Sequence, residues 1–429
     1  MWRRFNLLVI VTVFTVNGLV GQGKASSPYS VFGLGDLKSS GSIQFSEYGG
    51  AATGLLQKNI INFSNPASYR GIDSMRFVID FGFSNRLTQL ENDTESYTSN
   101  EFNFTYYAVG FRMAKWLHTS LGLVPTSNRN YRISSSGIVN DVYGENHYVG
   151  GGSLNEIYWG NSISILSNLS IGVNLKYYFG ELLETKTVLF PDELFTRNTQ
   201  EGYTRQVNGF GFSTGVMYTV PLREDRTLNI GATFSPEQRI DFKEDYLYGA
   251  TVGNNLDNID DNQIIDTTSF YVEKKGYFTL PNKLALGLSY EEPNKRFATV
   301  AFDYAMWGEV DNDNIANSLT NFRNSYRLSG GYGFTPKWNS AASYFKRATY
   351  RFGAFFENQY IEVNNQPLNE YAVSIGMGLP IRKVNAMLNI GLELGQRGAL
   401  KEDLIKENYI KLNLKLNFRE IWFFERKFD

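Results

Sequence analysis

The sequence of 429 residues contains no cysteine and only two histidines, His118 and His147. Without cysteine the protein has no disulfide scaffold, no thiolate metal site and no cysteine nucleophile. Two histidines are too few for a histidine-rich metal centre, so we expect neither a metal site nor a bound cofactor. The formal net charge of −2 gives no basic field for nucleic acid.

Long apolar runs are also missing. Beyond Ala25 there is no apolar stretch of the roughly 18 residues that a membrane-spanning helix needs. The mean hydropathy of −0.29 is likewise too polar for a helical membrane bundle. At the N-terminus, two arginines precede an apolar stretch over 7–20, and small residues follow it. This pattern predicts a secretory signal peptide over 1–25, cleaved after Gly21 or Ala25, with a signal anchor as the alternative.

What the sequence does contain is aromatic residues and glycine, in a period of two. It has 32 Phe, 27 Tyr, 6 Trp and 40 Gly. Between 169 and 180, large apolar residues alternate with small or polar ones, and 384–395 and 406–418 repeat the pattern. Strands of soluble proteins average about 5–6 residues, whereas these runs have the length of about 10 residues that a tilted strand needs to cross a bilayer. The alternation therefore predicts an all-β transmembrane antiparallel β-barrel.

Fourteen such segments can be placed along the chain, an even number as expected for a bacterial single-chain barrel. They lie at 74–84, 101–113, 117–125, 152–164, 167–181, 203–220, 225–235, 281–291, 296–307, 321–334, 347–357, 369–380, 384–395 and 406–418. The least regular are 101–113 and 152–164, so a count that differs by two is the alternative.

The connections between these segments alternate between long and short. Short periplasmic turns and long outer loops produce this alternation, which places both ends of the barrel on the periplasmic side. The longest connection, 236–280, is rich in Asp and Asn around 254–266. It is interpreted as a solvated loop, since its spacing does not match a calcium-binding loop. Within it, 239–247 and 268–279 extend two strands as a hairpin above the membrane.

Residues 26–73 do not alternate and are rich in glycine, serine and turn residues. A barrel of about 14 strands has a lumen wide enough to need a plug or to stand open. We therefore expect 26–73 to form an N-terminal hatch, or plug, inside the lumen, with a periplasmic extension as the alternative. The domain prediction is a signal peptide at 1–25, a hatch at 26–73 and an outer-membrane barrel at 74–429.

Several short motifs give the chain a resemblance to a known family. They are Ser27-Pro28-Tyr29-Ser30 with Gly35-Asp36-Leu37, Asn65-Pro66-Ala67, Leu121-Gly122-Leu123-Val124-Pro125-Thr126-Ser127, Leu280-Pro281-Asn282-Lys283, and Trp422-Phe423-Phe424-Glu425-Arg426-Lys427-Phe428. Through their order and position the mature chain resembles the FadL/TodX family of outer-membrane long-chain fatty acid transporters, in its Bacteroidota-type form.

The resemblance implies a barrel of 14 strands with an N-terminal hatch and a hydrophobic small molecule as ligand. It assigns Asn65, Pro66 and Ala67 to the hatch, and it makes the Ser27-Pro28-Tyr29 opening part of the same gate. The ligand would be captured outside and held by apolar side chains until the hatch moves. Pro125 then marks a defect in the wall that gives a sideways route, because proline removes a ladder hydrogen bond. The alternative is a strand that simply ends at Pro125.

Function at this stage has one leading interpretation and two alternatives. The first is hatch-gated transport of hydrophobic small molecules across the outer membrane. FadL-like barrels also resemble accessory subunits of the type IX secretion machinery, so a partner-binding barrel is the second. A narrow pore for small polar solutes is the third. Neither histidine lies in a nucleophile motif, so we expect no enzyme. A closed barrel has no free edges within its wall, so a monomer in contact with membrane lipid is expected.

Overall fold

The structure, a computed structural model, describes residues 27–38, 45–139, 142–191, 197–223, 225–252, 263–310, 320–338, 343–381, 385–401 and 404–421. The predicted signal peptide at 1–25, the acidic residues at 253–262 and the C-terminal motif at 422–428 lie outside these ranges. Among the described residues, no helix combines the length and the apolar character needed to cross a bilayer.

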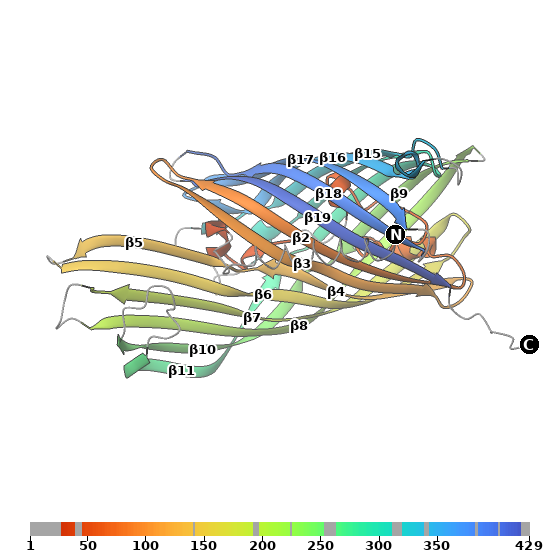
Figure 1. Cartoon of the computed structure of the whole chain (residues 1–429). Helices are drawn as coiled ribbons and strands as arrows, with labels where there is room; N and C mark the ends of the chain where they lie inside the picture. Colours follow the sequence, from red (N-terminus) through yellow and green to blue (C-terminus); the bar gives the residue numbers. More distant parts are fainter. Residues whose placement is uncertain are drawn as a thin grey trace, which may run out of the picture.

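The described strands form a single antiparallel sheet that closes on itself (Figure 1). The strands that form the wall pair in chain order, with β4 beside β6, β9 beside β12 and β13 beside β15. The last strand, β19, pairs with β2 from Lys406 opposite Glu91 to Ile421 opposite Arg76. This pairing makes a closed barrel of 14 strands, so the fold class predicted from the alternation is confirmed.

The strands of the wall have the following bounds. They are β2 (Arg76–Glu91), β3 (Ser96–Arg112), β4 (Leu117–Asn128), β6 (Val142–Ser164), β7 (Leu169–Leu189), β8 (Asn198–Arg223), β9 (Arg226–Ser235), β12 (Lys283–Glu292), β13 (Arg296–Ala305), β15 (Ser325–Phe334), β16 (Thr349–Val363), β17 (Gln366–Ile381), β18 (Ala386–Arg397) and β19 (Lys406–Ile421). Each coincides with one of the fourteen predicted segments, including the two that alternate least regularly.

Further elements continue the wall or lie within it. Four strands extend wall positions: β5 (Tyr131–Val139), β10 (Gln238–Val252), β11 (Gln263–Leu280) and β14 (Thr320–Phe322). The N-terminal part holds β1 (Asp36–Leu37) and the short 3₁₀ helices η1 (Pro28–Val31), η2 (Ser46–Tyr48) and η3 (Pro66–Gly71), while η5 (Trp307–Glu309) and η6 (Tyr344–Arg347) lie in connections.

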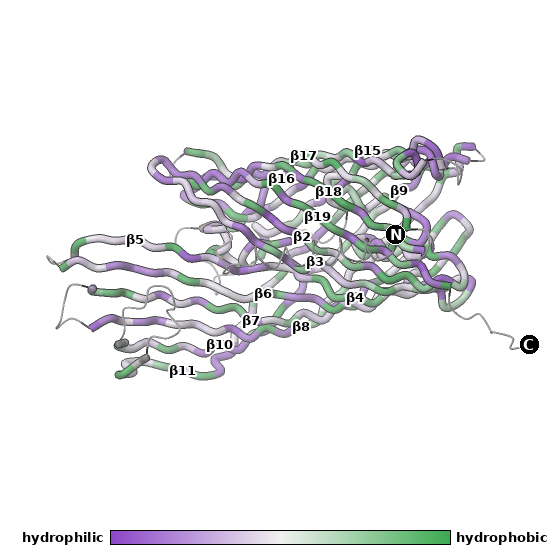
Figure 2. Tube along the Cα trace, viewed as in Figure 1, coloured by the Kyte–Doolittle hydropathy of each residue, from purple (hydrophilic) through white to green (hydrophobic). Residues whose placement is uncertain are grey.

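The strands present an apolar face outward and a small or polar face inward. Phe210 is 79% exposed and Leu175 is 49% exposed, whereas Ser213 and Asn174, on the opposite face of the same strands, are buried. Figure 2 shows the resulting alternation of hydrophobic and hydrophilic residues along the strands. The exposed aromatic and aliphatic side chains thus form the face that a bilayer covers.

Half of the wall continues well beyond the rim of the barrel, at the left of Figure 1. We call this part the outer wall; it consists of β5, β10 and β11 with the adjoining parts of β6, β7 and β8, and its strands pair in the order β5-β6-β7-β8-β10-β11. The expected hairpin within 236–280 is confirmed as β10 and β11. The connection between the predicted segments 117–125 and 152–164 is not one long loop, because β5 and the first part of β6 pair there.

The sequence missed β5 because it alternates weakly. Ser134, Ser135, Ser136 and Gly137 follow one another in its centre, and all four are exposed. Beyond Tyr131, which is buried, β5 is largely exposed and its one pairing among the described strands is with β6. These residues need no apolar face, so hydrophobic period gives no signal for them.

Candidate functional site

The N-terminal segment at 27–38 and 45–73 lies within the ring of strands in Figure 1 and packs against their inward face. Its side chains join two buried apolar clusters with the wall. Tyr29 and Leu34 pack with Trp307 and Tyr360 in one cluster, and Ile61 joins the other.

Glycines on the inward face allow this contact. A Cβ atom at Gly231 would lie 2.0 Å from the carbonyl oxygen of Thr53, and one at Gly353 would lie 2.1 Å from the backbone nitrogen of Gly49. These distances are far below van der Waals contact, so no larger residue fits at either place without moving backbone. The glycine-rich face read from the sequence is therefore a seat for the N-terminal segment.

The Asn65-Pro66-Ala67 motif begins helix η3 and ties it to the wall. The Asn65 side chain accepts a hydrogen bond from the Ala67 amide at 3.1 Å, which caps the helix. Its amide group also donates to the carbonyl oxygens of Thr53 at 2.8 Å and Val216 at 3.2 Å. Ser162 and Ser170 of β6 and β7 both donate to the carbonyl oxygen of Ala67. The motif is thus the point where the segment is fixed to three strands.

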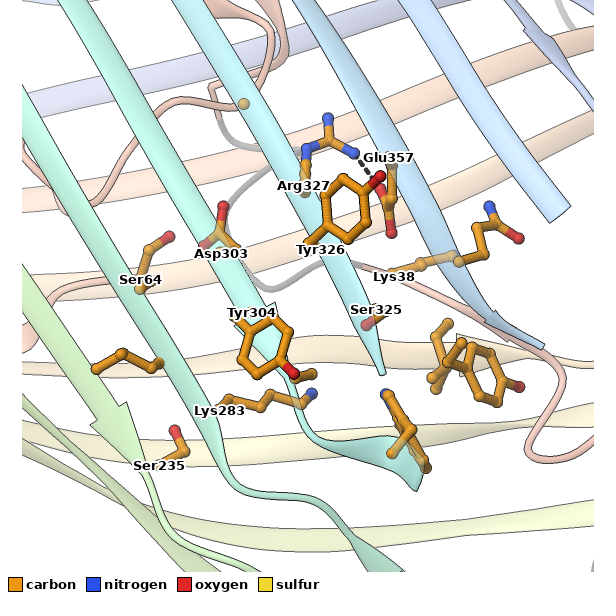
Figure 3. Close-up of a pocket in the computed structure, with 18 of the residues that line it drawn as sticks. Lys38, Ser64, Ser235, Lys283, Asp303, Tyr304, Ser325, Tyr326, Arg327 and Glu357 are labelled. Carbon is orange, nitrogen blue, oxygen red and sulfur yellow. Dashed lines mark hydrogen bonds and ion pairs between the residues drawn. The ribbon is translucent and has the colours of Figure 1, made fainter. Parts of the chain in front are cut away.

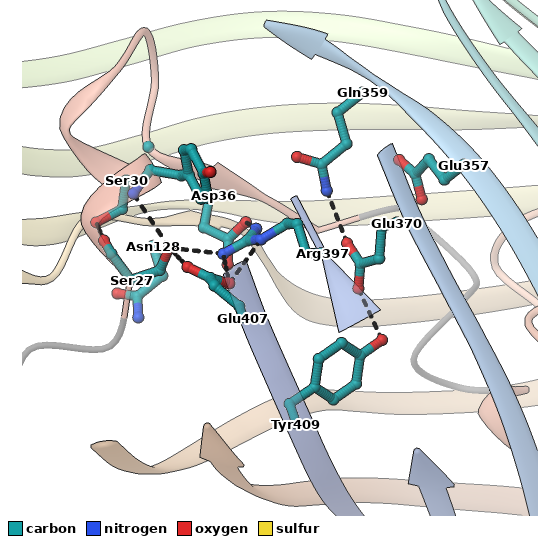
Figure 4. A network of polar contacts seen from close by, with 12 residues as sticks. Ser27, Ser30, Asp36, Asn128, Glu357, Gln359, Glu370, Arg397, Glu407 and Tyr409 are labelled. Atoms are coloured by element: carbon teal, nitrogen blue, oxygen red, sulfur yellow. Dashed lines mark hydrogen bonds and ion pairs between the residues drawn. The ribbon is translucent and has the colours of Figure 1, made fainter. Parts of the chain in front are cut away.

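The Ser27-Pro28-Tyr29 motif takes part in a buried ionic network (Figure 4). Ser27 caps η1 and donates to Glu407 Oε1 at 2.5 Å, while Arg397 Nη2 donates to the Ser27 hydroxyl at 2.6 Å. Arg397 also binds Asp36 at 2.6 Å and Glu407 at 2.7 Å. Arg397 is 1% exposed and Glu407 is fully buried. The cation from β18 therefore joins the N-terminal segment to β19.

The pKa of Asp36 reflects this network. Burial raises the pKa of the carboxyl, but Arg397 and Arg86 lower it by more, so the pKa lies below its ordinary value. Asp36 accordingly stays ionised at neutral pH although it is buried.

A second buried ion pair holds the middle of the segment. Lys415 of β19 donates to Glu47 Oε2 at 2.8 Å, and Glu47 is fully buried. The side chain of Glu47 lies against Gly376 and Gly391, where a Cβ atom would come within 2.3 and 2.7 Å of its Cγ atom. Sequence reasoning missed Glu47, Lys415, Arg397 and Glu407. The available signal was charge on an inward face that is otherwise small and neutral.

Pro125 lies where the wall changes its pairing. The ladder between β3 and β4 ends at Tyr107 opposite Leu123, and the register between β4 and β6 shifts between Pro125 and Ser127. Strand β4 nevertheless continues to Asn128. Beyond Pro125, β1 of the N-terminal segment pairs with it, with Leu37 opposite Ser127.

The lumen that remains is small and charged. One cavity of about 150 Å³ is lined by eight charged side chains, among them Lys283, Asp303, Arg327 and Glu357, together with uncharged residues (Figure 3). Arg327 forms an ion pair with Glu357 across adjacent strands. A second cavity of about 90 Å³ lies beside β1 and is lined largely by charged side chains from the N-terminal segment and seven wall strands: Asp36, Lys38, Arg86, Glu101, Arg327, Glu357, Glu370, Glu393 and Lys411.

The two histidines lie in different parts of the barrel. His118 is buried near the short turns. In the β5–β6 hairpin, His147 Nδ1 lies 3.0 Å from the Ser134 hydroxyl and its Nε2 lies 3.2 Å from Glu145 Oε2. This chain of hydroxyl, imidazole and carboxylate was not foreseen. None of its residues lines either lumen cavity, and acyl transfer needs a cleft with oxyanion donors. Among the described residues, no three His, Asp or Glu side chains gather as metal ligands.

Comparison with known proteins gives one family and a set of similar folds. Searching curated proteins finds no match. A Pseudomonas aeruginosa FadL homologue is 10% identical, with a TM-score of 0.58 over 91% of this chain and 100% of the other. The CymD monoaromatic hydrocarbon channel is 12% identical, with a TM-score of 0.55 over 91% and 99%. The Pseudomonas putida toluene transporter TodX is 13% identical, with a TM-score of 0.54 over 91% and 100%.

At these identities the structural likeness shows that the chain has the fold of FadL and TodX, and no more. The family model that matches is BamG, and the match extends over residues 1–429. The chain therefore belongs to the BamG family.

Proposed function

We propose that this protein is a closed outer-membrane barrel that binds a protein partner through its outer wall, as a component of a larger assembly. The observation that carries the proposal is strand β5, which among the described strands forms a ladder with β6 alone, so that its other edge is open. An unpaired edge presents a row of backbone donors and acceptors that an extended segment of another chain can complete.

The two edges of the outer wall differ in how they are protected. Most edge strands are blunted by charge, proline or a bulge. On β11, Glu273, Lys274 and Lys275 carry charge, and the ladder to β10 shifts register beside them. On β5, residues 133–139 carry neither charge nor proline. The edge of β5 is therefore the more favourable place for strand addition.

The lumen gives little support to a conduit for hydrophobic molecules. Ligand pockets for small molecules usually measure about 300–1,000 Å³ and are mostly apolar. The lumen cavities have volumes of about 150 and 90 Å³, and ionisable side chains line both. An apolar molecule passing them would desolvate those charges without replacing their hydrogen bonds, which is unfavourable.

The test places a photo-crosslinking amino acid at Ile138, whose side chain is 75% exposed, in the full chain in its own membrane. We expect one discrete protein adduct. The double variant S134K/S136K, which charges the β5 edge, should lose it, whereas T267K/S269K on β11 should retain it. An adduct of equal yield in both variants, or none in the unsubstituted background, would exclude the β5 edge as the binding surface.

A second candidate is transport of hydrophobic small molecules such as long-chain fatty acids. It is favoured by the change of pairing at Pro125, where β3 leaves β4 and two residues of the N-terminal segment occupy the free edge. Uptake of a radiolabelled fatty acid should then fall in cells that lack the chain. Unchanged uptake would exclude this function, and single-channel conductance of the purified barrel tests the narrow polar pore.

Several predicted properties are common to all three functions. Residues 1–25 are removed on export, 26–73 act as the hatch, and 74–429 form a barrel resident in the outer membrane. Because the wall closes on itself, the barrel needs no second copy to satisfy its strands, and we propose a monomer. The protein partner that we propose is a component of a secretion system, as the sequence resemblance suggests.

A further inference from the structure

A further cavity lies at the end of the barrel that carries the short turns. It measures about 680 Å³, and its lining includes turn residues Lys115, Ser167 and Asn294 together with Gln57 and Arg70 of the N-terminal segment. A volume of this size holds a small molecule or a short peptide segment. Its lining contains neither Arg397, Asp36 and Glu407 of the ionic network nor any residue of the outer wall.

The lining is strongly cationic. Eight Lys or Arg side chains line the cavity, against three Asp or Glu side chains. Glu292 is already neutralised by Lys295 at 2.7 Å and Arg296 at 2.9 Å. Six of the cations form no ion pair with a carboxylate in the described part of the chain: Lys58, Arg70, Arg112, Lys115, Arg351 and Arg419. Lys58 nevertheless interacts electrostatically with Glu291, and Arg419 with Asp73 and Asp80, so the cavity holds an excess of positive charge that the described carboxylates offset in part.

Two polar groups on its wall have unused hydrogen-bonding atoms. Arg70 donates to the Thr219 hydroxyl through Nη2, while its Nη1 is buried and has no hydrogen-bond partner. The side chain of His118 is 3% exposed, and its Nδ1 likewise has none. Buried polar atoms in native proteins nearly always find a partner, so these two atoms mark a place for one.

The remaining wall of the cavity is apolar. Leu56 and Leu166 contribute to it, and Trp338, which is 50% exposed, lies at its opening. A bare inorganic ion would leave this part of the cavity uncovered. The lining therefore suits an anionic group carried on a partly apolar body.

We propose that this cavity is a binding site for a carboxylate or phosphate group, which accepts hydrogen bonds from Arg70 Nη1 and His118 while Arg112 supplies further positive charge. Arginine is suited to this task because its planar guanidinium binds both anions in a fixed geometry. The site lies at the opposite end of the barrel from the outer wall, and the inference does not depend on the proposed function.

The test measures binding to the purified full chain in detergent by calorimetry, with two probes. One is inorganic phosphate, and the other is a short peptide rich in Glu and Phe. We expect the unsubstituted chain to bind at least one probe. A peptide that binds at least tenfold more tightly than phosphate identifies a polypeptide carboxylate as the source, and similar affinities identify a free anion.

Two variants locate the site and one controls for charge. Arg70→Gln and His118→Gln should each weaken binding by about 10-fold or more, as expected for loss of a hydrogen bond to a charged group. Lys295→Gln removes a cation that lines the same cavity but is already paired, and should change affinity by less than about twofold. Heat-modified gel mobility confirms that each variant is folded. Equal weakening by all three variants, unchanged binding in both Arg70→Gln and His118→Gln, or no binding of either probe would overturn the proposal.

Discussion

Arg397 is the residue whose replacement should release the start of the N-terminal segment. It is 1% exposed and binds Asp36 at 2.6 Å, Glu407 at 2.7 Å and the Ser27 hydroxyl at 2.6 Å. In Arg397→Met the aliphatic stem is kept, but Glu407 and Asp36 lose their nearest cation and keep the more distant Arg86, at 3.6 and 4.0 Å. Breaking a buried ion pair by removing one partner costs about 3–5 kcal/mol, because the other charge stays buried without compensation.

The cost should appear as local opening. The wall is held by its own ladder of backbone hydrogen bonds, so β18 and β19 need not unfold when η1 and β1 detach. A loss of about 3–5 kcal/mol corresponds to roughly a hundred- to a few-thousand-fold increase in the opening equilibrium of residues 27–38. Hydrogen exchange of the purified barrel, followed by mass spectrometry, measures this protection directly.

The matched control is the double variant R397M/E407Q. It removes the stranded charge as well as the cation, and a buried pair replaced on both sides is often tolerated. We therefore expect it to recover part of the protection that R397M loses. Unchanged exchange at 27–38 in R397M, with or without E407Q, would refute the conclusion that this network holds the segment.

Three further predictions follow from the same contacts. Gly231→Val should displace the N-terminal segment, at a cost of about 1–3 kcal/mol for overpacking. Gly330→Ala is the control, because its Cβ atom would meet its nearest neighbour at 3.5 Å, and it should leave the free energy of unfolding in urea unchanged. Asn65→Ala removes a helix cap and two hydrogen bonds, and should raise proteolysis within 45–73 with a local cost of about 1–3 kcal/mol. Because the fold lowers the pKa of Asp36, its ionised carboxyl contributes stability at pH values above its ordinary pKa. This stability is lost as the pH falls through the pKa of Asp36 in the folded protein. Protection of 27–38 should consequently be constant near neutral pH and fall only in strong acid, and a loss at pH 6 would contradict this.

The wall could be predicted almost completely from the sequence. The alternation of apolar and small residues depends only on which side of a strand each residue faces, and it located all fourteen strands. The outer wall was predicted in part. The β10–β11 hairpin has aromatic alternation, whereas the centre of β5 is an exposed run of serine and glycine, so its sequence has no period to read.

The contacts across the lumen could not be predicted in the same way. Arg397 and Asp36 are 361 positions apart, and Lys415 and Glu47 are 368 apart. Their pairing depends on closure of the sheet, which brings β18 and β19 around to the N-terminal segment. The sequence motifs at 27–29 and 65–67 pointed to places where that segment is anchored, but gave no sign of the charges that hold it.

The sequence by itself determined the barrel: its strand number, its lipid-facing residues and its small inward face, because strand period is a local property of the chain. Only the tertiary structure decided what fills the lumen, which edges of the outer wall remain unpaired, and which cations at the short-turn end lack a carboxylate. These features arise between residues far apart in the sequence, and their energies depend on burial that exists only once the sheet has closed.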